Sequence, residues 1–202
     1  MLKKIALGVA ALLVVLVIVI ATRPAEFEIS RSRTIAAPPE VAFAWLDDFH
    51  HWQDWSPWEK LDPTMKRELT GSPAGPGAAY HWVGNDKVGE GRMTITATEP
   101  PRSVTIRLEF LKPFAATNTT LFELAPNGTG TTVTWRMSGH NNFMAKAFSL
   151  FMNMDAMVGP DFERGLANLD AATAAAAAAP VSGASPDLGT GASTTPSAPA
   201  GT

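Results

Sequence analysis

The sequence contains no cysteine and only a small excess of acidic over basic residues. Without cysteine, the 202-residue chain has no disulfide scaffold, no cysteine-ligated zinc or iron–sulfur site, and no cysteine nucleophile. With 16 Lys and Arg against 19 Asp and Glu, the net charge is −3. Surfaces that bind nucleic acid normally carry a basic excess, so we predict no nucleic-acid partner.

Motifs of several enzyme classes are also missing. The chain has no Gly-x-Ser-x-Gly motif and no glycine-rich loop followed by Lys and Ser or Thr. Asp47, Asp48, His50 and Asp54 lie close together in sequence, but they lack the spacing of a zinc-binding motif. We interpret them as polar loop residues. The sequence therefore predicts no metal site and no cofactor, and it identifies neither a catalytic residue nor a protein partner.

One long apolar run is present near the N-terminus. Residues 5–21 form an uncharged stretch of 17 residues, which as a helix would be about 26 Å long. That length is just enough to cross the hydrocarbon core of a bilayer, with Lys3, Lys4 and Arg23 at its ends. We therefore expect residues 1–24 to anchor the protein in the cell membrane as a single span. The two lysines before the run predict a cytoplasmic N-terminus and an extracytoplasmic domain.

Two other interpretations of the apolar run remain open. The run could be a cleaved signal peptide, with residues 19–21 at the cleavage site, or a buried helix of a soluble protein. The hydrophobic region of a signal peptide usually has about 7–15 residues. Because this run is longer and rich in Val, Ile and Leu, we favour a retained anchor that contacts the lipid bilayer through residues 5–21.

The C-terminal residues 180–202 have a low-complexity composition. Twenty of these 23 residues are Pro, Gly, Ser, Thr or Ala. Such a segment cannot bury enough apolar surface to offset the entropy lost on ordering, so it is predicted to be a disordered tail. Residues 25–179 remain for one folded domain.

Alternating apolar and polar residues predict several half-buried strands in this domain. The connections between them are short and rich in turn residues, which favours sequential antiparallel pairing over a parallel sheet. The apolar faces of the predicted strands are Phe27, Ile29 and Ile35; Ala78, Tyr80 and Trp82; Met93, Ile95 and Ala97; Val104, Ile106, Leu108 and Phe110; and Val133, Trp135 and Met137.

Helical patterns flank the strands. Pro38-Pro39-Glu40 favours the start of a short helix, because proline is tolerated and glutamate is stabilising in the first turn. A second helical pattern begins near Asn142 and extends toward Pro180, with a break or kink expected at Gly159-Pro160. The expected fold class is α+β: a curved antiparallel sheet wrapped around a long C-terminal helix, plus an N-terminal transmembrane helix.

Several motifs carry a family resemblance. They are Ile35-Ala-Ala-Pro-Pro-Glu-Val41, Trp55-Ser-Pro-Trp-Glu-Lys-Leu-Asp-Pro63, Gly75-Pro-Gly-Ala78 with Trp82, Lys87-Val-Gly-Glu-Gly91, Gly128-Thr-Gly-Thr-Thr-Val-Thr-Trp135, and Phe162-Glu-Arg-Gly-Leu-Ala-Asn-Leu169. In these positions and in element order, the chain resembles the START-like helix-grip superfamily, also called SRPBCC, and within it the polyketide cyclase/dehydrase branch. The resemblance implies a cavity between the last helix and the sheet, because ligands of this superfamily lie there. It implies little about chemistry, because the superfamily includes lipid carriers, receptors, chaperone regulators and enzymes.

Candidate cavity residues follow from these patterns. The large residues on the presumed inner strand faces are Tyr80, Trp82, Ile106, Leu108 and Trp135. The tryptophan-rich loop adds Trp55 and Trp58, and the last helical region adds Phe148, Phe151 and Met152. For the residues of the tryptophan-rich loop and for those of the last helical region, the alternative is packing in the core. Arg31 could bind a ligand carboxylate or phosphate if its strand face points inward; otherwise it lies at the rim or on a bulged strand.

The sequence thus favours a membrane-anchored module that binds an apolar small molecule or a lipid. One alternative is a cyclase- or dehydratase-type enzyme acting on such a ligand, which would need an acid or base directed into the cavity. The other alternative is an interaction domain whose cavity has collapsed. The volume of the cavity distinguishes the last alternative from the first.

Overall fold

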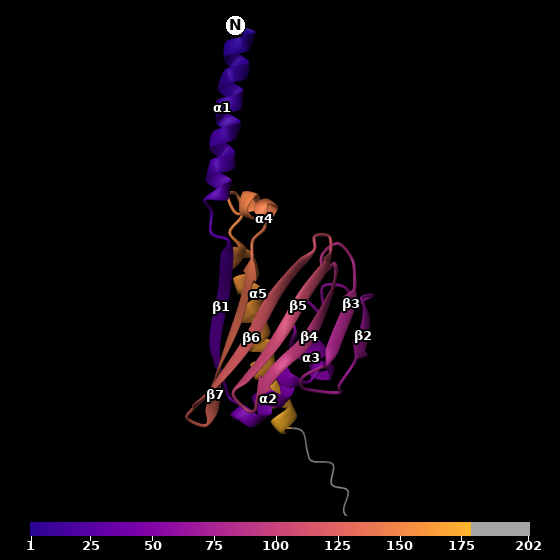
Figure 1. The fold of residues 1–202 in the computed structure, drawn as a ribbon. Helices are drawn as coiled ribbons and strands as arrows, with labels where there is room; N and C mark the ends of the chain where they lie inside the picture. Colours follow the sequence, from indigo (N-terminus) through magenta and orange to yellow (C-terminus); the bar gives the residue numbers. More distant parts are fainter. Residues whose placement is uncertain (179–202) are drawn as a thin grey trace, which may run out of the picture.

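Within residues 1–178, seven antiparallel strands form one sheet in the order β1-β7-β6-β5-β4-β3-β2, which brings the first strand next to the last (Figure 1). The computed structural model describes residues 1–178. The observed strands confirm the antiparallel meander that the alternation of apolar and polar residues predicts. These are β1 (Glu26–Ile35), β2 (Lys66–Thr70), β3 (Ala79–Val83), β4 (Glu90–Glu99), β5 (Ser103–Lys112), β6 (Ala116–Asn127) and β7 (Gly130–His140).

Helices lie on one face of this sheet and at its ends, as Figure 1 shows. The helix α1 (Leu2–Ala21) projects away from the sheet, and α4 (Phe143–Phe148) lies next to the end of α1 that joins the domain. The remaining helical segments connect β1 to β2 and follow β7. The segments between β1 and β2 are α2 (Pro39–Asp47), the 3-10 helix η1 (Phe49–His51) and α3 (Trp52–Trp55), and those after β7 are α4 (Phe143–Phe148) and α5 (Met154–Ala178). The predicted α+β fold, with a sheet curved around a C-terminal helix, is confirmed.

The C-terminal helical region is interrupted at a different place from the predicted one. The chain leaves helical geometry between α4 and α5, around residues 149–153, whereas α5 continues through Gly159-Pro160. Of the break or kink expected at Gly159-Pro160, the break is therefore wrong, and the kink stays a prediction. Gly159 has a packing role instead: a side chain at this position would collide with the guanidinium of Arg31, which crosses the helix here. Burial of the following stripe, Phe162 and Leu166, holds the helix together past the proline.

The hydrophobic core fills the half of the domain farther from α1. Phe162, Leu166 and Leu169 of α5 are each at most 1% exposed and pack against the inner face of the sheet. Aromatic rings dominate this region, because Trp55 contacts both Phe122 and Trp135 edge to face. Such close packing leaves little free space in this half of the molecule.

The two ends of the chain differ in what the structure describes. The helix α1 is long and apolar enough to cross a membrane. Only 6% of its most apolar 18-residue stretch is buried against the rest of the protein. The predicted tail, residues 180–202, lies outside the described residues, so its disorder stays a prediction.

Candidate functional site

A cavity of about 290 Å³ lies between α5 and the inner face of the sheet. Strands β3 to β7 form one wall, and the first turns of α5 form the opposite wall. The loop after α3 and the loop between β3 and β4 close the remaining sides. The volume is at the lower end of the range found for small-molecule sites, and the surface is mostly apolar, as is usual for such sites.

Side-chain size along β6 and α5 changes where the cavity meets the core. Along β6, the inward residues Asn118 and Thr120 border the cavity, whereas the next inward residues, Phe122 and Leu124, are large and fill the core. The helix α5 changes in the same direction, because Val158 faces the cavity and Phe162 marks the beginning of the core. Side-chain size along two facing elements thus positions the empty space.

Five of the residues expected from sequence do line the cavity: Trp58, Tyr80, Trp82, Leu108 and Trp135. Strand pairing brings the sheet residues together, since β3, β4 and β5 are neighbours and Met93 pairs with both Tyr80 and Leu108. Whether any of these side chains touches a ligand stays a proposal.

Two further candidates, Trp55 and Ile106, lie in the core and not on the cavity wall. Both are fully buried, and Trp55 packs between Trp52 and Trp135 at ring-centroid distances of 4.8 and 5.6 Å. The tryptophan-rich loop therefore has two roles. Trp55 fills the core, as the alternative interpretation held, while Trp52 and Trp58 form the inner end of the cavity.

The helical candidates Phe148, Phe151 and Met152 do not line the cavity. Phe148 ends α4, and the other two lie in the connection to α5, where they are 51%, 86% and 42% exposed, respectively. The sequence predicts a helical pattern from near Asn142 onward, with these three residues and Met154 on one stripe that faces the cavity. The chain direction changes after α4, so this part of the stripe faces outward. The helical wall of the cavity comes instead from Met154, Val158 and Phe162.

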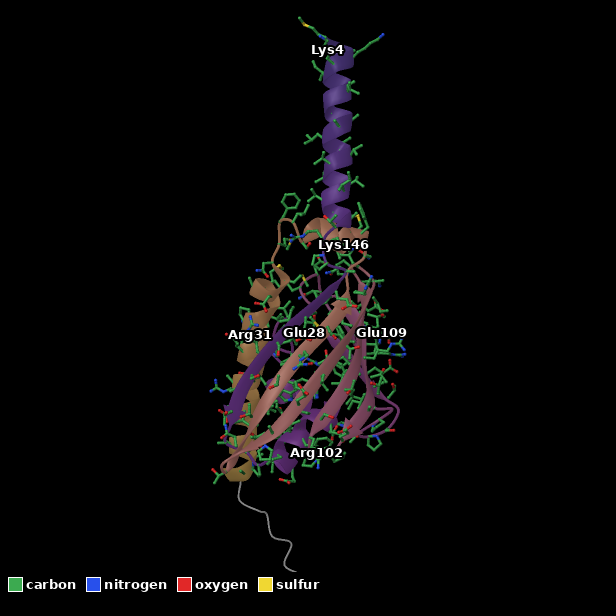
Figure 2. All side chains as sticks on the ribbon, turned by 60° about the vertical axis from the view of Figure 1, so that its left-hand side comes forward. Lys4, Glu28, Arg31, Arg102, Glu109 and Lys146 are labelled. Carbon is green, nitrogen blue, oxygen red and sulfur yellow. The ribbon has the colours of Figure 1, made fainter. Side chains whose placement is uncertain are left out.

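Arg31 points across α5 and does not line the cavity (Figure 2). Its guanidinium forms ion pairs of 2.8 Å with both Asp155 and Glu163 of α5. The pairing of β1 with β7 is continuous around Arg31, which excludes the bulge considered from sequence. Arg31 holds the pKa of Asp155 below its usual value through this hydrogen-bonded pair. The arginine thus attaches the edge strand to the helix, and its two carboxylate partners occupy the positions that a ligand anion would take.

A polar group that sequence reasoning missed lies on the cavity wall. The Tyr80 hydroxyl donates a hydrogen bond of 2.5 Å to Glu59 Oε1, and Arg67 Nε donates one of 2.6 Å to Glu59 Oε2. Glu59 is only 8% exposed and Tyr80 only 4%. Arg67 satisfies the buried carboxylate with charge as well as a hydrogen bond, which a buried anion requires. The cavity wall therefore contains an acidic side chain, Glu59, in contact with the hydroxyl of Tyr80.

Burial and the Glu59 carboxylate raise the pKa of Tyr80 above its ordinary value. Because the chain contains a single tyrosine, ultraviolet absorbance reports the Tyr80 phenolate alone. We expect the phenolate to form only well above pH 10, the ordinary midpoint for tyrosine. In Glu59→Gln it should form at lower pH, since the repelling negative charge is gone.

The raised pKa also determines how stability depends on pH. The unfolded chain ionises this tyrosine near pH 10 and the folded chain only at higher pH. The protonated Tyr80 therefore makes its full stabilising contribution to the unfolding free energy below about pH 10. This contribution is lost as the pH rises above that value. A native phenolate titration at or below pH 10 would contradict the buried contact with Glu59.

Two polar side chains on β6 complete the wall. Asn118 and Thr120 are 8% and 4% exposed and face the cavity. The Asn118 amide nitrogen lies 3.9 Å from the sulfur of Met137, which is a weak acceptor. An amide and a hydroxyl in an apolar wall are the groups that orient a ligand with one polar end. Within residues 1–178, no three His, Asp or Glu side chains are grouped to hold a metal ion.

Solved structures with the same fold share little sequence with this chain. Protein MLL2253 from Mesorhizobium loti is 18% identical, with a TM-score of 0.54 over 74% of this chain and 98% of that one. A protein from Rhizobium leguminosarum is 13% identical, with a TM-score of 0.55 over 74% and 95%. The Aha1 dimer from Colwellia psychrerythraea is 17% identical, with a TM-score of 0.53 over 73% and 96%. These are helix-grip proteins, and at such identities they show the fold alone.

The family comparison is more specific. No curated protein matches the chain. The model of the family described as "Polyketide cyclase / dehydrase and lipid transport" matches residues 26–174, which span the sheet and nearly all of α5. The resemblance inferred from the sequence motifs is confirmed. A cavity between the C-terminal helix and the sheet, and a family model that covers both, lead to one assignment: the chain belongs to the polyketide cyclase/dehydrase and lipid transport family.

Proposed function

We propose that this protein is a membrane-anchored binding module that holds an apolar small molecule or a lipid between α5 and the sheet. The observation that carries the proposal is the cavity itself, which is mostly apolar and open enough to admit a ligand. Family and fold suggest the same broad function, a domain that binds a hydrophobic ligand or acts as a cyclase. An existing cavity weighs against the alternative of an interaction domain with a collapsed interior.

The proposed ligand contacts are the aromatic and aliphatic side chains of the wall. Trp58, Trp82 and Leu108 offer apolar surface, and Met93 and Val158 face them from β4 and α5. Polar atoms are grouped at two places, Glu59 with Tyr80 and Asn118 with Thr120. A ligand with a long apolar body and one or two hydrogen-bonding groups would match this distribution.

The membrane part of the proposal is supported by α1. Its 20 residues would span about 30 Å, the thickness of a hydrocarbon core, and an 18-residue stretch of this helix has a mean hydropathy of 2.9. Lys3 and Lys4 favour a cytoplasmic N-terminus and a domain outside the cytoplasm. Labelling of a Thr129→Cys variant by a membrane-impermeant maleimide in intact cells would support this orientation. Labelling only after the membrane is broken would contradict it.

Native mass spectrometry of the full chain, extracted from membranes in mild detergent, tests both parts of the proposal. We expect a retained anchor to give the full mass of 21.4 kDa. A second series of peaks, heavier by the mass of one small apolar molecule, should accompany it. A shorter chain would support signal cleavage. A full-length chain that carries no ligand, and that binds no apolar fluorescent probe, would contradict the binding function.

An enzymatic role is the second candidate, and the contact between Glu59 and Tyr80 favours it. A cyclase or dehydratase needs a proton donor or acceptor at the ligand, and these are an acid and a hydroxyl on the cavity wall. The two candidates differ in what Glu59→Gln would retain. If the protein only binds, the variant and the unaltered chain carry the same molecule. If it catalyses a reaction, the variant accumulates a different molecule, the unconverted substrate.

A further inference from the structure

Exposed apolar side chains are concentrated at one end of the domain. Among the described residues that follow α1, nine large apolar side chains are at least 42% exposed, and all nine lie in two short segments. One segment is the end of β5 with the turn that follows it, residues 111–114, and the other runs from α4 into the first turn of α5, residues 143–157. We call these two segments the apolar rim. The most exposed members are Phe114 at 74% and Phe151 at 86%.

The apolar rim lies at the end where α1 joins the domain (Figure 1). Strand register places it there, because Glu26, at the start of β1, pairs with His140 at the end of β7, just before α4. Gly139 in turn pairs with Asn118 near the start of β6, next to the β5–β6 turn. The two segments touch, since the rings of Phe114 and Phe148 are 6.5 Å apart.

The position of α4 relative to a bilayer follows from its contacts with the end of α1. Arg23, two residues beyond α1, donates a hydrogen bond of 3.2 Å from its guanidinium to the carbonyl of Ser149, one residue beyond α4. Figure 2 shows Lys146 of α4 at the base of α1. Basic residues at the end of a membrane span lie at the headgroup level of the bilayer. If α1 spans the membrane, α4 therefore lies at that level.

The bilayer is the occupant that this arrangement favours. A patch of this kind on a soluble surface marks a partner or a membrane. Met144 and Phe148 are one helical turn apart on α4, so they present one apolar face, while Lys146 projects elsewhere. A short helix with an apolar face and a nearby lysine suits the interface between headgroups and acyl chains. Continuity with an apolar helix that already extends from this end points to the same membrane.

The cavity opens at the same end. Of the residues that line it, the exposed ones are Lys87, in the β3–β4 loop, and Met154, at the start of α5. Met154 also belongs to the apolar rim. The other end of the cavity is closed by Trp135 and Phe162, which stack with ring centroids 4.1 Å apart. The opening of the cavity thus lies between Lys87 and Met154, beside the apolar rim.

We propose that the apolar rim is a membrane-contact surface, and that the ligand passes directly between the bilayer and the cavity through the opening beside Met154. Contact of the rim with the bilayer depends on the chain being anchored. Passage of a ligand rests, in addition, on the proposed binding function. The first experiment below tests contact and the second tests passage, so that failure of one is distinguishable from failure of the other.

Membrane contact can be measured because the chain lacks cysteine. A Phe151→Cys variant of the full chain, labelled with an environment-sensitive fluorophore, is reconstituted into vesicles of phosphatidylcholine and phosphatidylglycerol. We expect spin-labelled lipids with the quencher in the upper acyl chain to quench most of this fluorescence. The matched control is Thr129→Cys, in the exposed β6–β7 turn at the opposite end of the sheet, which should not be quenched. Equal quenching at the two positions, or none at residue 151, would overturn membrane contact.

Passage is tested by comparing two ways of presenting the same probe, a fluorescent fatty acid. In Phe148→Asp, reconstituted into vesicles that carry the probe in the same bilayer, uptake into the cavity should become about tenfold slower or more. The aspartate lowers the population of the state in which the rim contacts the bilayer, and burial of one Phe corresponds to at least a tenfold change in that equilibrium. Equilibrium binding of the probe added in detergent should stay unchanged. The control is Leu69→Asp, an exposed apolar residue of β2 outside the rim, which should change neither. Equal uptake by Phe148→Asp and the unaltered chain would overturn passage. Absence of probe binding in every variant would overturn the binding function, and with it passage, while leaving the quenching result intact.

Discussion

Replacing Val158 with tryptophan should reduce the affinity for an apolar fluorescent probe by at least about tenfold, equivalent to 1.4 kcal/mol or more. Val158 lies on the helical wall of the cavity, half-buried, and faces the sheet residues across a space of about 290 Å³. An indole ring at this position would occupy the volume that a ligand needs. Because the ring enters empty space, the change should cost less stability than the 1–3 kcal/mol typical of overpacking a filled core.

Two further variants make this test specific. Ala174→Trp places the same ring on an exposed position of the same helix, far along α5 from the cavity, and should leave probe affinity unchanged. Phe151→Trp should also leave it unchanged, because residue 151 lies outside the cavity wall. Probe titration and thermal unfolding are measured on each variant. Native affinity in Val158→Trp would mean that the ligand binds elsewhere. A large loss of stability would mean that the space is filled in solution.

The sheet was predictable from sequence because period-two alternation reports a local property. Most residues of the predicted faces, such as Tyr80 with Trp82 and Val133 with Trp135, lie on observed strands and point inward. Ala97 is the exception, because a register shift between Ile95 and Ala97 turns it outward and leaves it exposed. Short turns left antiparallel pairing as the simplest arrangement, and that arrangement is the one found. For this reason more of the candidates taken from strands than of those taken from helices lie on the cavity wall.

The helical candidates lie off the cavity wall for a physical reason. Periodicity identifies an apolar stripe, but it does not distinguish a stripe that faces a core from one that faces outward. Phe148, Phe151 and Met152 are as apolar as Phe162 and Leu166, yet only the latter two are buried. The difference arises from the break between α4 and α5, which no proline or glycine in residues 149–153 indicates. The local signal at the break is Asn153, whose side-chain oxygen accepts a hydrogen bond from the Ala156 backbone N–H at the start of α5.

The polar group of the cavity could not be predicted either. Glu59 and Tyr80 are 21 residues apart in sequence, and a loop and a strand bring them together. Arg67 joins them because β2 pairs with β3 in a register that places it opposite Trp82. The available signal was weak: a glutamate within the tryptophan-rich motif, next to Trp58. Such groups become visible only when the register of the strands is known.

Phe162→Ala should be the most destabilising single change among the residues discussed, at about 3–5 kcal/mol. Phe162 is 1% exposed, stacks on Trp135 with an interplanar angle of 5°, and meets Trp58 edge to face. Removing the ring deletes buried apolar surface and two aromatic contacts and leaves a void at the inner end of the cavity. For a domain of this size, the midpoint of thermal unfolding should fall by roughly 6–20 °C.

The effect of Phe162→Ala on binding separates an open cavity from a closed core. Because Phe162 forms the boundary between the two, the void in the variant is continuous with the cavity. A bulkier apolar ligand should then fit, and its addition should recover part of the lost thermal stability, since a ligand that binds only the folded state stabilises it. Phe151→Ala is the matched control: at 86% exposure, its loss should change stability by less than about 0.5 kcal/mol. A Phe162→Ala variant as stable as the control would show that the stack of Phe162 on Trp135 does not hold α5 against the sheet.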